Sequence, residues 1–250
     1  MQRTKLHKKC HWEQTIAQLH QLGLARADSQ LRISFAYLFR VCVHGQYMLI
    51  PSERRPNVYQ PIGGVYHYHP SEIKFLADHY QVKNEHGEIP DISKSGDYRL
   101  CVPGIYLQPF LQRFDQTAAR ESICNVGREF VEEAIHTGMF SFMKIKYRYC
   151  GRHISSIQFS DYCNCYKLLM ADIVELLPDK YQFDVLTNYL GISSPNYLFA
   201  TSEIIRNRQW SGCFSGCPPI IAEHAWKILI ENENILLKDP NDACTYEVEL

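Results

Sequence analysis

Apolar residues alternate with other residues along 33–43, and this period of two constrains the fold more than any other feature. The apolar positions are Ile33, Phe35, Tyr37, Phe39, Val41 and Val43. Such alternation is typical of a β-strand with one buried face. A turn is predicted at His44-Gly45, after which QYMLI at 46–50 returns as a second strand. The sequence therefore predicts a core built on a β-hairpin.

Length and charge narrow the class of protein. The chain has 250 residues, enough for one large domain or two small ones with a buried core. Its 26 basic and 27 acidic residues provide no general attraction to nucleic acid or to anionic membranes. No stretch approaches the ~18 uncharged apolar residues that a membrane-spanning helix needs. We therefore expect neither a membrane segment nor general nucleic-acid binding.

The ten cysteines are scattered along the chain, and no signal-peptide pattern opens the sequence. The pairs Cys163/Cys165 and Cys213/Cys217 lack a second CxxC or HxxxH partner, which favours free thiols over zinc binding. These features predict a reducing, cytoplasmic location.

Further periodic segments indicate one α/β domain with a mixed sheet. Residues 1–30 are expected to be an N-terminal segment with a short helix at 12–25, and 31–250 the main domain. Strands are predicted at 140–149, 154–159 and 166–177, and helices at 115–138 and 220–231. Residues 65–114 are less regular, and their polar run KNEHGEIPDISKSGD is typical of an exposed loop inside a larger insertion.

Three glutamates are concentrated on the predicted helix 115–138. Glu129, Glu132 and Glu133 fall within roughly 100° of arc on one helix face. Their mutual repulsion destabilises a helix, but a hard divalent cation such as Mg²⁺ or Mn²⁺ between them removes that cost. The alternative is a solvated acidic face with Arg128 as a surface partner, which is common. The residues alone leave both interpretations open.

The segment REFVEE at 128–133 resembles the core of the Nudix box, which ends in Arg-Glu-apolar-x-Glu-Glu-x-Gly. The hairpin 33–50, the basic pair Arg54-Arg55 and YQPIGG at 59–64 resemble the Nudix hairpin, basic pair and Pro-x-Gly-Gly turn. The resemblance implies a Nudix fold, in which helices sandwich a mixed β-sheet.

The sequence departs from the usual Nudix box in two ways, and these departures restrict the resemblance to one group of Nudix domains. Gly64 and Arg128 are 64 positions apart rather than fourteen, so the box carries a long insertion at about 65–114, and EEAIHTG replaces Glu-Glu-x-Gly. The first box glutamate has two candidates, Glu72 and Glu121. This split box is similar to the SMODS-associated Nudix domains, which are encoded near cyclic-oligonucleotide synthases in bacterial antiphage systems such as CBASS.

The resemblance implies chemical roles for the glutamates. Glu129 matches the general base of many Nudix members, and Glu129 and Glu133 are the expected catalytic residues. Glu129, Glu132 and Glu133 would hold Mg²⁺ or Mn²⁺ if the site is active. Glu203 is a downstream candidate for an additional base, although a surface glutamate is the simpler interpretation.

Further residues are candidates for binding the ligand, each with a simpler structural alternative. The arginines are either phosphate contacts or solvated loop charges. The tyrosine either stacks on a base or packs at a sheet edge, and the glycines serve a tight turn. The histidines of HYH, His67 and His69, alternate and either face one pocket or face solvent; without a third ligand they are weak evidence for a metal, and a solvent-facing position is expected. The candidate ligand-binding residues are Arg54, Arg55, Tyr59, Gly63, Gly64 and Arg128.

The resemblance implies two main functions. The first is a module that senses a nucleotide second messenger, a cyclic oligonucleotide or a related compound, with a second copy of the chain or a separate effector chain as partner. The second is a Mg²⁺-dependent hydrolase that cleaves a nucleoside diphosphate-linked substrate. A third alternative is an interaction domain with a vestigial site.

Overall fold

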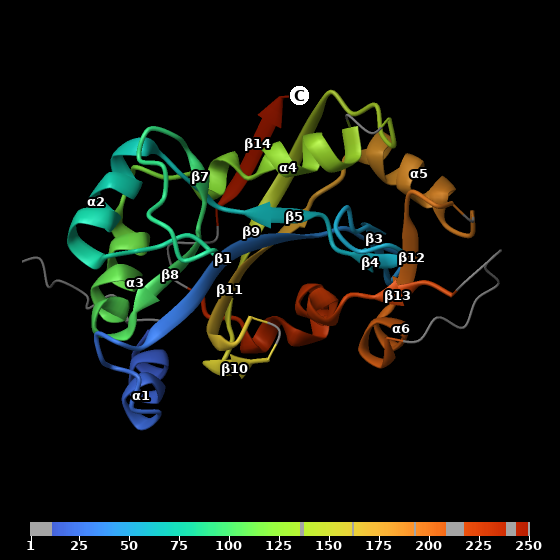
Figure 1. Cartoon of the computed structure of the whole chain (residues 1–250). Helices are drawn as coiled ribbons and strands as arrows, with labels where there is room; N and C mark the ends of the chain where they lie inside the picture. The colour runs from blue at the N-terminus through green and yellow to red at the C-terminus, as the bar shows by residue number, and fades with distance from the viewer. Residues whose placement is uncertain are drawn as a thin grey trace, which may run out of the picture.

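A computed structural model describes residues 12–135, 138–161, 163–192, 194–208, 218–238 and 244–249. Its larger sheet is built around β1 (Gln30–Arg40), which pairs in parallel with β11 (Cys165–Leu176) (Figure 1). The remaining strands of this sheet are antiparallel to their neighbours. They are β9 (Lys144–Ile154), β14 (Thr245–Glu249), β10 (Gln158–Ser160), β5 (Gly63–Val65) and β8 (Arg99–Pro103).

The predicted hairpin is confirmed, but its first strand is split between two sheets. After β1, the short strand β2 (Cys42–Val43) pairs with β3 (Gln46–Pro51) across a turn in which His44 and Gly45 have φ of 48° and 73°. β3 belongs to a smaller sheet, which also contains β12 (Leu198–Thr201), β4 (Val58–Gln60) and β13 (Ile220–Ile221).

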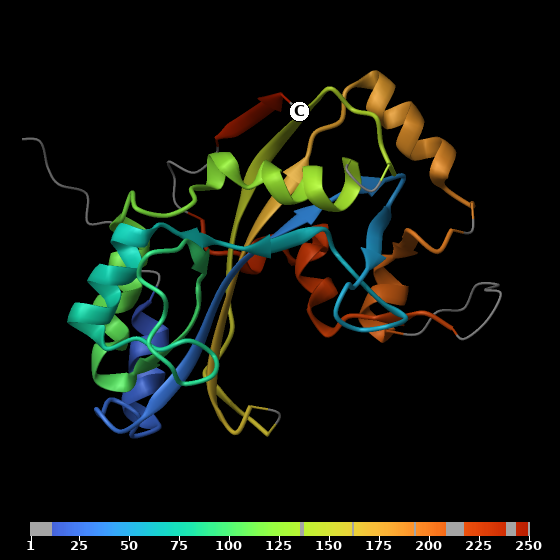
Figure 2. The ribbon, with the colours of Figure 1, turned by 45° about the horizontal axis from the view of Figure 1, so that its top comes forward.

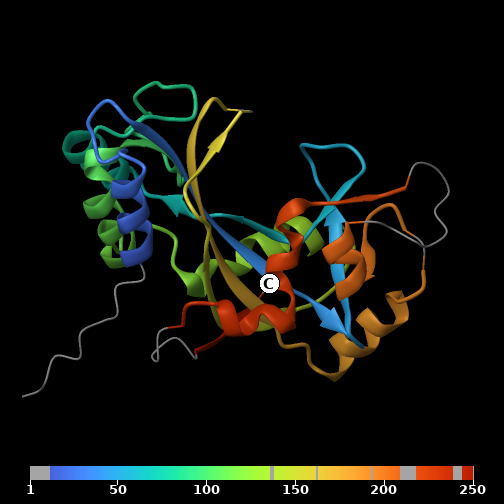
Figure 3. The ribbon, with the colours of Figure 1, turned by 90° about the horizontal axis from the view of Figure 1, so that it is seen from below.

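Helical segments cover both faces of the larger sheet, as expected for a mixed sheet between helices. On one face lies α4 (Gly127–Phe130), continued by the π-helical turn η3 (Val131–Ile135) (Figure 2). The Phe130 ring lies 5.4 Å from that of Phe39. On the other face, seen in red in Figure 3, η4 (Glu223–Ile228) packs with Leu38 and Ile173 in a second buried cluster. The neighbouring residues Leu38 and Phe39 of β1 therefore point toward opposite faces of the larger sheet.

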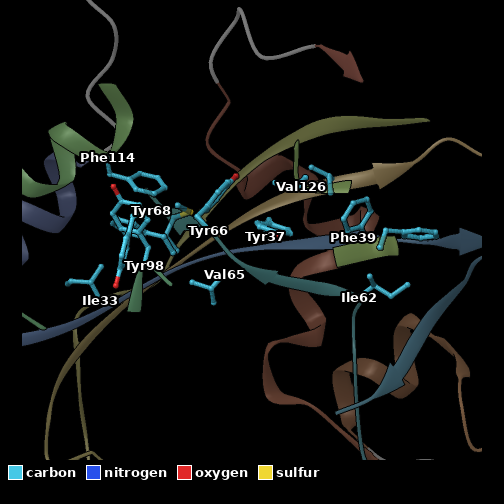
Figure 4. Packing of buried hydrophobic residues seen from close by; sticks show 14 of the residues in the cluster. Ile33, Tyr37, Phe39, Ile62, Val65, Tyr66, Tyr68, Tyr98, Phe114 and Val126 are labelled. Atoms are coloured by element: carbon cyan, nitrogen blue, oxygen red, sulfur yellow. The ribbon is translucent and has the colours of Figure 1, made fainter. Parts of the chain in front are cut away.

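The segment expected as an insertion shares the main core. It contains β6 (His67–Tyr68), α2 (Pro70–Tyr80), β7 (Gly96–Asp97), η1 (Gly104–Tyr106) and α3 (Leu107–Gln116). The Phe114 ring lies 4.0 Å from that of Phe35, and Figure 4 shows Phe114, Tyr66 and Tyr98 gathered at one end of β1. The polar run 83–97 is mostly exposed, as predicted. In the same cluster, Trp12 and Leu19 bring α1 (Glu13–Gln21) onto the core.

The prediction of one helix over 115–138 is wrong. Helix α3 ends at Gln116, and the next helical residues are η2 (Ile123–Asn125) and then α4. The segment between pairs with β6 instead, because Glu121 N–H donates to His67 O and His69 N–H donates to Ala119 O. Long-range pairing therefore overrides local helix propensity. The predicted end of the helix agrees with the positive φ of 73° at Gly138.

The predicted helix at 220–231 consists of 3₁₀ turns, η4 followed by η5 (Ile230–Ile235). The two are separated by Leu229, whose ψ of 135° is extended. The fully buried Arg40 side chain donates to the carbonyls of Ile228 and Leu229 at this break. A continuous helix would have used those carbonyls itself.

Strand boundaries also differ from the predictions. The strand predicted at 140–149 begins at Lys144 and runs to Ile154. The strand predicted at 154–159 overlaps the end of β9 at Ile154 and β10 at 158–159. The strand predicted at 166–177 corresponds to β11. The remaining helices are α5 (Lys180–Tyr189) and α6 (Ser202–Asn207). Among the described residues, no helix is long and apolar enough to cross a membrane.

A buried ionic network holds the main sheet to the segment beside it. The Asp172 carboxylate on β11 is 2% exposed and accepts hydrogen bonds from Arg152 Nε at 2.8 Å and Tyr66 Oη at 2.8 Å. Arg152 also donates to Asp115 at the end of α3 over 2.7 Å. Because every charge in this network has a partner, burial of the network is tolerated.

Candidate functional site

The glycine turn lies directly against the acidic helical segment. The backbone N–H of Gly63 donates to Glu133 Oε2 over 2.9 Å. A Cβ added to Gly64 would lie 2.2 Å from Glu129 Oε1, and one added to Gly63 would lie 2.2 Å from the Tyr37 carbonyl oxygen. At Gly63 a side chain would collide with the backbone, and at Gly64 it would displace the Glu129 side chain, so the glycine turn is in close contact with the glutamates.

Arg128 links three carboxylates. Its guanidinium donates to Glu132 Oε2 at 2.8 Å and to Glu129 Oε1 at 3.0 Å, and its Nε lies 3.4 Å from Glu121 Oε1. Arg128 also donates to the Tyr37 hydroxyl at 3.3 Å. The planar fork of arginine suits such multiple pairing.

Of the two candidates for the first box glutamate, Glu121 is the one at the site. Its Oε2 accepts the backbone N–H of His67 at 3.3 Å, and its other oxygen faces Arg128. Glu72 is fully buried elsewhere, where it pairs with Arg113 at 2.6 Å and accepts from Thr117 Oγ1 at 2.7 Å. Glu72 therefore stabilises the packing of α2 against α3.

The environment raises the pKa values of two of the glutamates, Glu129 and Glu133. Burial raises the pKa of Glu133 to about 8, the negative charges of Glu129, Glu53 and Glu132 act the same way, and the Gly63 N–H partly opposes them. Burial also raises the pKa of Glu129, although the charge of Arg128 counteracts it. Glu133 therefore carries a proton through much of the neutral range.

The three glutamates converge only in part. Glu129 and Glu133 face the glycine turn, whereas Glu132 is 48% exposed and turns toward Arg128. Carboxylate oxygens suit Mg²⁺ and Mn²⁺ chemically. Within the described residues, however, no three acidic, histidine or cysteine side chains are grouped so that they could hold a metal ion. As arranged, the carboxylates do not fit a ready metal centre.

The two arginines of the predicted basic pair diverge. Both lie in the exposed loop after β3. The charge of Arg54 acts on Asp97 and Arg99, whereas that of Arg55 acts on His224 in η4. The charges of the two arginines therefore act on different segments, that of Arg54 on the segment after the glycine turn.

Other predicted residues lie in structural positions. Tyr59 is 4% exposed, belongs to the second core cluster and donates its hydroxyl to Pro195 O at 3.0 Å, which favours its packing alternative over base stacking. Glu203 lies in the first turn of α6, which packs on β12 and η4. His69 is exposed immediately before α2, as expected.

Sequence reasoning missed a polar cluster beside the site. His67 Nε2 lies 3.1 Å from Asp97 Oδ1, and Arg99 pairs with Asp97 Oδ2 at 3.1 Å. The hydrogen bond to Asp97 raises the pKa of His67, and the charges of Glu121 and Arg128 reach the same imidazole. The only local signal was the HYH alternation, and the pairing of β6 with β7 that brings Asp97 there is long-range.

The cysteines do not form a metal site within the described residues. Cys163 Sγ and Cys165 Sγ lie 3.3 Å apart at the turn before β11, as free thiols. Cys213 and Cys217 lie outside the described residues.

Comparison with known proteins gives one family. The model of the SMODS-associated NUDIX domain matches residues 30–229, which include both sheets apart from β14, the glycine turn and the acidic helical segment. No curated protein and no solved structure matches the chain.

Proposed function

The chain belongs to the SMODS-associated NUDIX domain family, and from that membership we propose that it binds a nucleotide second messenger without hydrolysing it. The ligand class is a cyclic oligonucleotide or a related compound, and the context is bacterial antiphage defence of the CBASS type. The similarity to domains encoded near cyclic-oligonucleotide synthases supports this class of ligand. The partner that receives the signal is a second copy of the chain or a separate effector.

One observation carries the choice of binding over hydrolysis. Arg128 engages Glu129 and Glu132, and Glu133 is held by the Gly63 N–H. These are the carboxylates that a Nudix hydrolase would use on its metal ions. Engaged in this way, they are acceptors for hydrogen-bond donors of a ligand, such as ribose hydroxyls or base amino groups.

The charges also limit where the phosphates of a ligand bind. Arg128 can neutralise only one of the three carboxylates it contacts. Phosphate oxygens placed directly on Glu129 and Glu132 would therefore face net negative charge. In metal-free binding the phosphates must lie on other cationic residues close by.

The alternative function is a Mg²⁺-dependent hydrolase that cleaves a nucleoside diphosphate-linked substrate. It is favoured by the contact of Glu129 and Glu133 with the glycine turn. It requires Glu132 to leave Arg128, because the present arrangement groups no three ligands for a cation among the described residues.

Separation of reaction products tests the two functions. The protein is incubated with Mg²⁺ and a panel of cyclic di- and trinucleotides, nucleotide sugars and dinucleoside polyphosphates. We expect at least one panel member to bind and to remain intact. Turnover that Glu129→Gln abolishes would show that the protein is a hydrolase.

A further inference from the structure

A cationic cluster lies beside the candidate site and comes from three separate segments. Arg54 belongs to the loop after β3, His67 to β6 and Arg99 to the first residue of β8. Two of them pair with one carboxylate, and the charge of the third acts on it. His67 and Arg99 each lie 3.1 Å from an oxygen of Asp97, and the charge of Arg54 acts on both Asp97 and Arg99.

The cluster has more positive than negative charge. Asp97 pairs with one guanidinium and one imidazole, and the charge of Arg54 adds to theirs. Glu85, whose charge also acts on Arg99, is already paired with Arg32. Lys94 and Asp91 pair with each other on the same loop. Within the described residues Arg54 forms no ion pair. Bringing two arginines together around one carboxylate is unfavourable unless a further anion is shared between them.

The side chains are accessible to a ligand while remaining fixed by the fold. The side chain of Arg99 is 21% exposed and that of His67 is 40% exposed. Arg99 is positioned by the register of β8 with β1, in which it lies opposite Ser34. His67 and Asp97 are held opposite each other by the pairing of β6 with β7. Preorganised groups of this kind lose little conformational entropy on binding.

The cluster is continuous with the glutamates. Glu121 accepts the backbone N–H of His67 at 3.3 Å and lies against Arg128 at 3.4 Å. Arg128 in turn contacts Glu129, which meets Gly64. A nucleotide that places hydroxyl or amino groups on the glutamates would therefore reach the cluster with a phosphate.

We propose that Arg54, His67 and Arg99 form a phosphate-binding subsite next to the Nudix-box glutamates, contributed largely by the segment between the two halves of the box. The ligand class is a nucleotide whose phosphate binds in this subsite while its sugar or base contacts the glutamates. The identity of the ligand as a nucleotide rests on the proposed function. The anion subsite rests on its own geometry.

Inorganic pyrophosphate is the probe that isolates the subsite. Isothermal titration at low ionic strength, without metal ions, compares the wild-type protein with Arg99→Gln and Arg54→Gln. We expect each substitution to weaken pyrophosphate binding by at least ~10-fold, because a charge-assisted contact is removed. Arg32→Gln is the matched control, because Arg32 is a nearby arginine that is already paired with Glu85. The affinity of this variant for pyrophosphate should differ from that of the wild-type protein by less than ~2-fold.

Asp97→Asn gives a test of opposite sign. Removal of the shared carboxylate should tighten pyrophosphate binding, whereas a residue with a merely structural role would weaken it on substitution. Arg54 lies in an exposed loop, so Arg54→Gln remains informative if a strand substitution unfolds the protein. Absence of pyrophosphate binding by the wild-type protein, or wild-type affinity in both Arg54→Gln and Arg99→Gln, would overturn the proposal.

The same variants distinguish this proposal from the proposed function. If pyrophosphate binding depends on Arg99 but no member of the nucleotide panel binds, the subsite stands and the messenger function fails. If a cyclic nucleotide binds and neither Arg54→Gln nor Arg99→Gln weakens it, the messenger function stands and the subsite is wrong.

Discussion

The Glu133 carboxylate accepts the backbone N–H of Gly63 over 2.9 Å, which joins the glycine turn to a helical segment 70 residues further along the chain. This contact joins the two parts of the candidate site although β6, α2, β7, β8 and α3 lie between them in sequence. The site is therefore assembled by tertiary packing, and substitutions on either half should affect both.

Gly64→Ala tests the close approach of the turn to Glu129. The new Cβ would lie 2.2 Å from Glu129 Oε1, so that side chain must move away from the turn. We expect nucleotide binding to weaken at least ~10-fold and the free energy of unfolding to fall by about 1–3 kcal/mol. Gly127→Ala is the matched control on α4, since its Cβ would meet only side-chain atoms, at 3.3 Å or more. Equal effects of both substitutions would contradict a specific contact.

Arg128 should be energetically coupled to Glu121. The two side chains are 32% and 8% exposed, so the pair is largely shielded from water. A double-mutant cycle with Arg128→Gln and Glu121→Gln, measured by urea unfolding, should give a coupling energy of about 1 kcal/mol or more. The exposed pair Lys144–Glu247 serves as comparison and should give a much smaller coupling energy. Additive effects for Arg128 and Glu121 would show that the pairing is incidental.

Glu133 should make stability depend on pH. Its pKa is raised from the model-peptide value of 4.5 to about 8, chiefly by burial, so the folded state holds the proton more tightly than the unfolded state. The stabilisation is complete below about pH 4.5 and is lost as pH rises to about 8. Glu133→Gln should remove this slope, and its stability relative to the wild-type protein should increase with pH across that window. If the free energies of unfolding of the wild-type protein and Glu133→Gln change in parallel from pH 4 to 9, Glu133 does not have the raised pKa.

The buried Asp172–Arg152 pair should be essential for stability. Asp172→Asn removes the charge that offsets the buried guanidinium and weakens two hydrogen bonds of 2.8 Å. We expect a loss of about 3–5 kcal/mol in the free energy of unfolding. Glu247→Gln on the exposed edge strand β14 should reduce the free energy of unfolding far less. A loss for Asp172→Asn no larger than that would contradict the network.

The sequence predicted those parts of the fold that depend on local patterns. The alternation after Ile33 marked β1, His44-Gly45 marked the hairpin turn, and the glycine pair with REFVEE marked the two halves of the site. All three signals are contained within a few residues of chain, so one sequence is sufficient to detect them.

The parts that were missed depend on long-range contacts. Residues 117–122 have helical propensity, yet they pair with β6 and thereby bring Glu121 to Arg128. The buried Arg40 interrupts the last helical segment because it donates hydrogen bonds to two of its carbonyl oxygens. Asp97 and Arg99 reach the site only because β7 and β8 pair with strands far away in sequence. No local pattern encodes such partners.

The requirement for a metal ion tests the central claim most directly. A cyclic nucleotide that binds in the panel is titrated into the protein by calorimetry, once with excess EDTA and once with Mg²⁺. Because Arg128 engages Glu129 and Glu132, we expect the two dissociation constants to agree within ~3-fold, with the ligand recovered intact. Binding that is lost in EDTA, together with Mg²⁺-dependent cleavage of the ligand, would contradict the account.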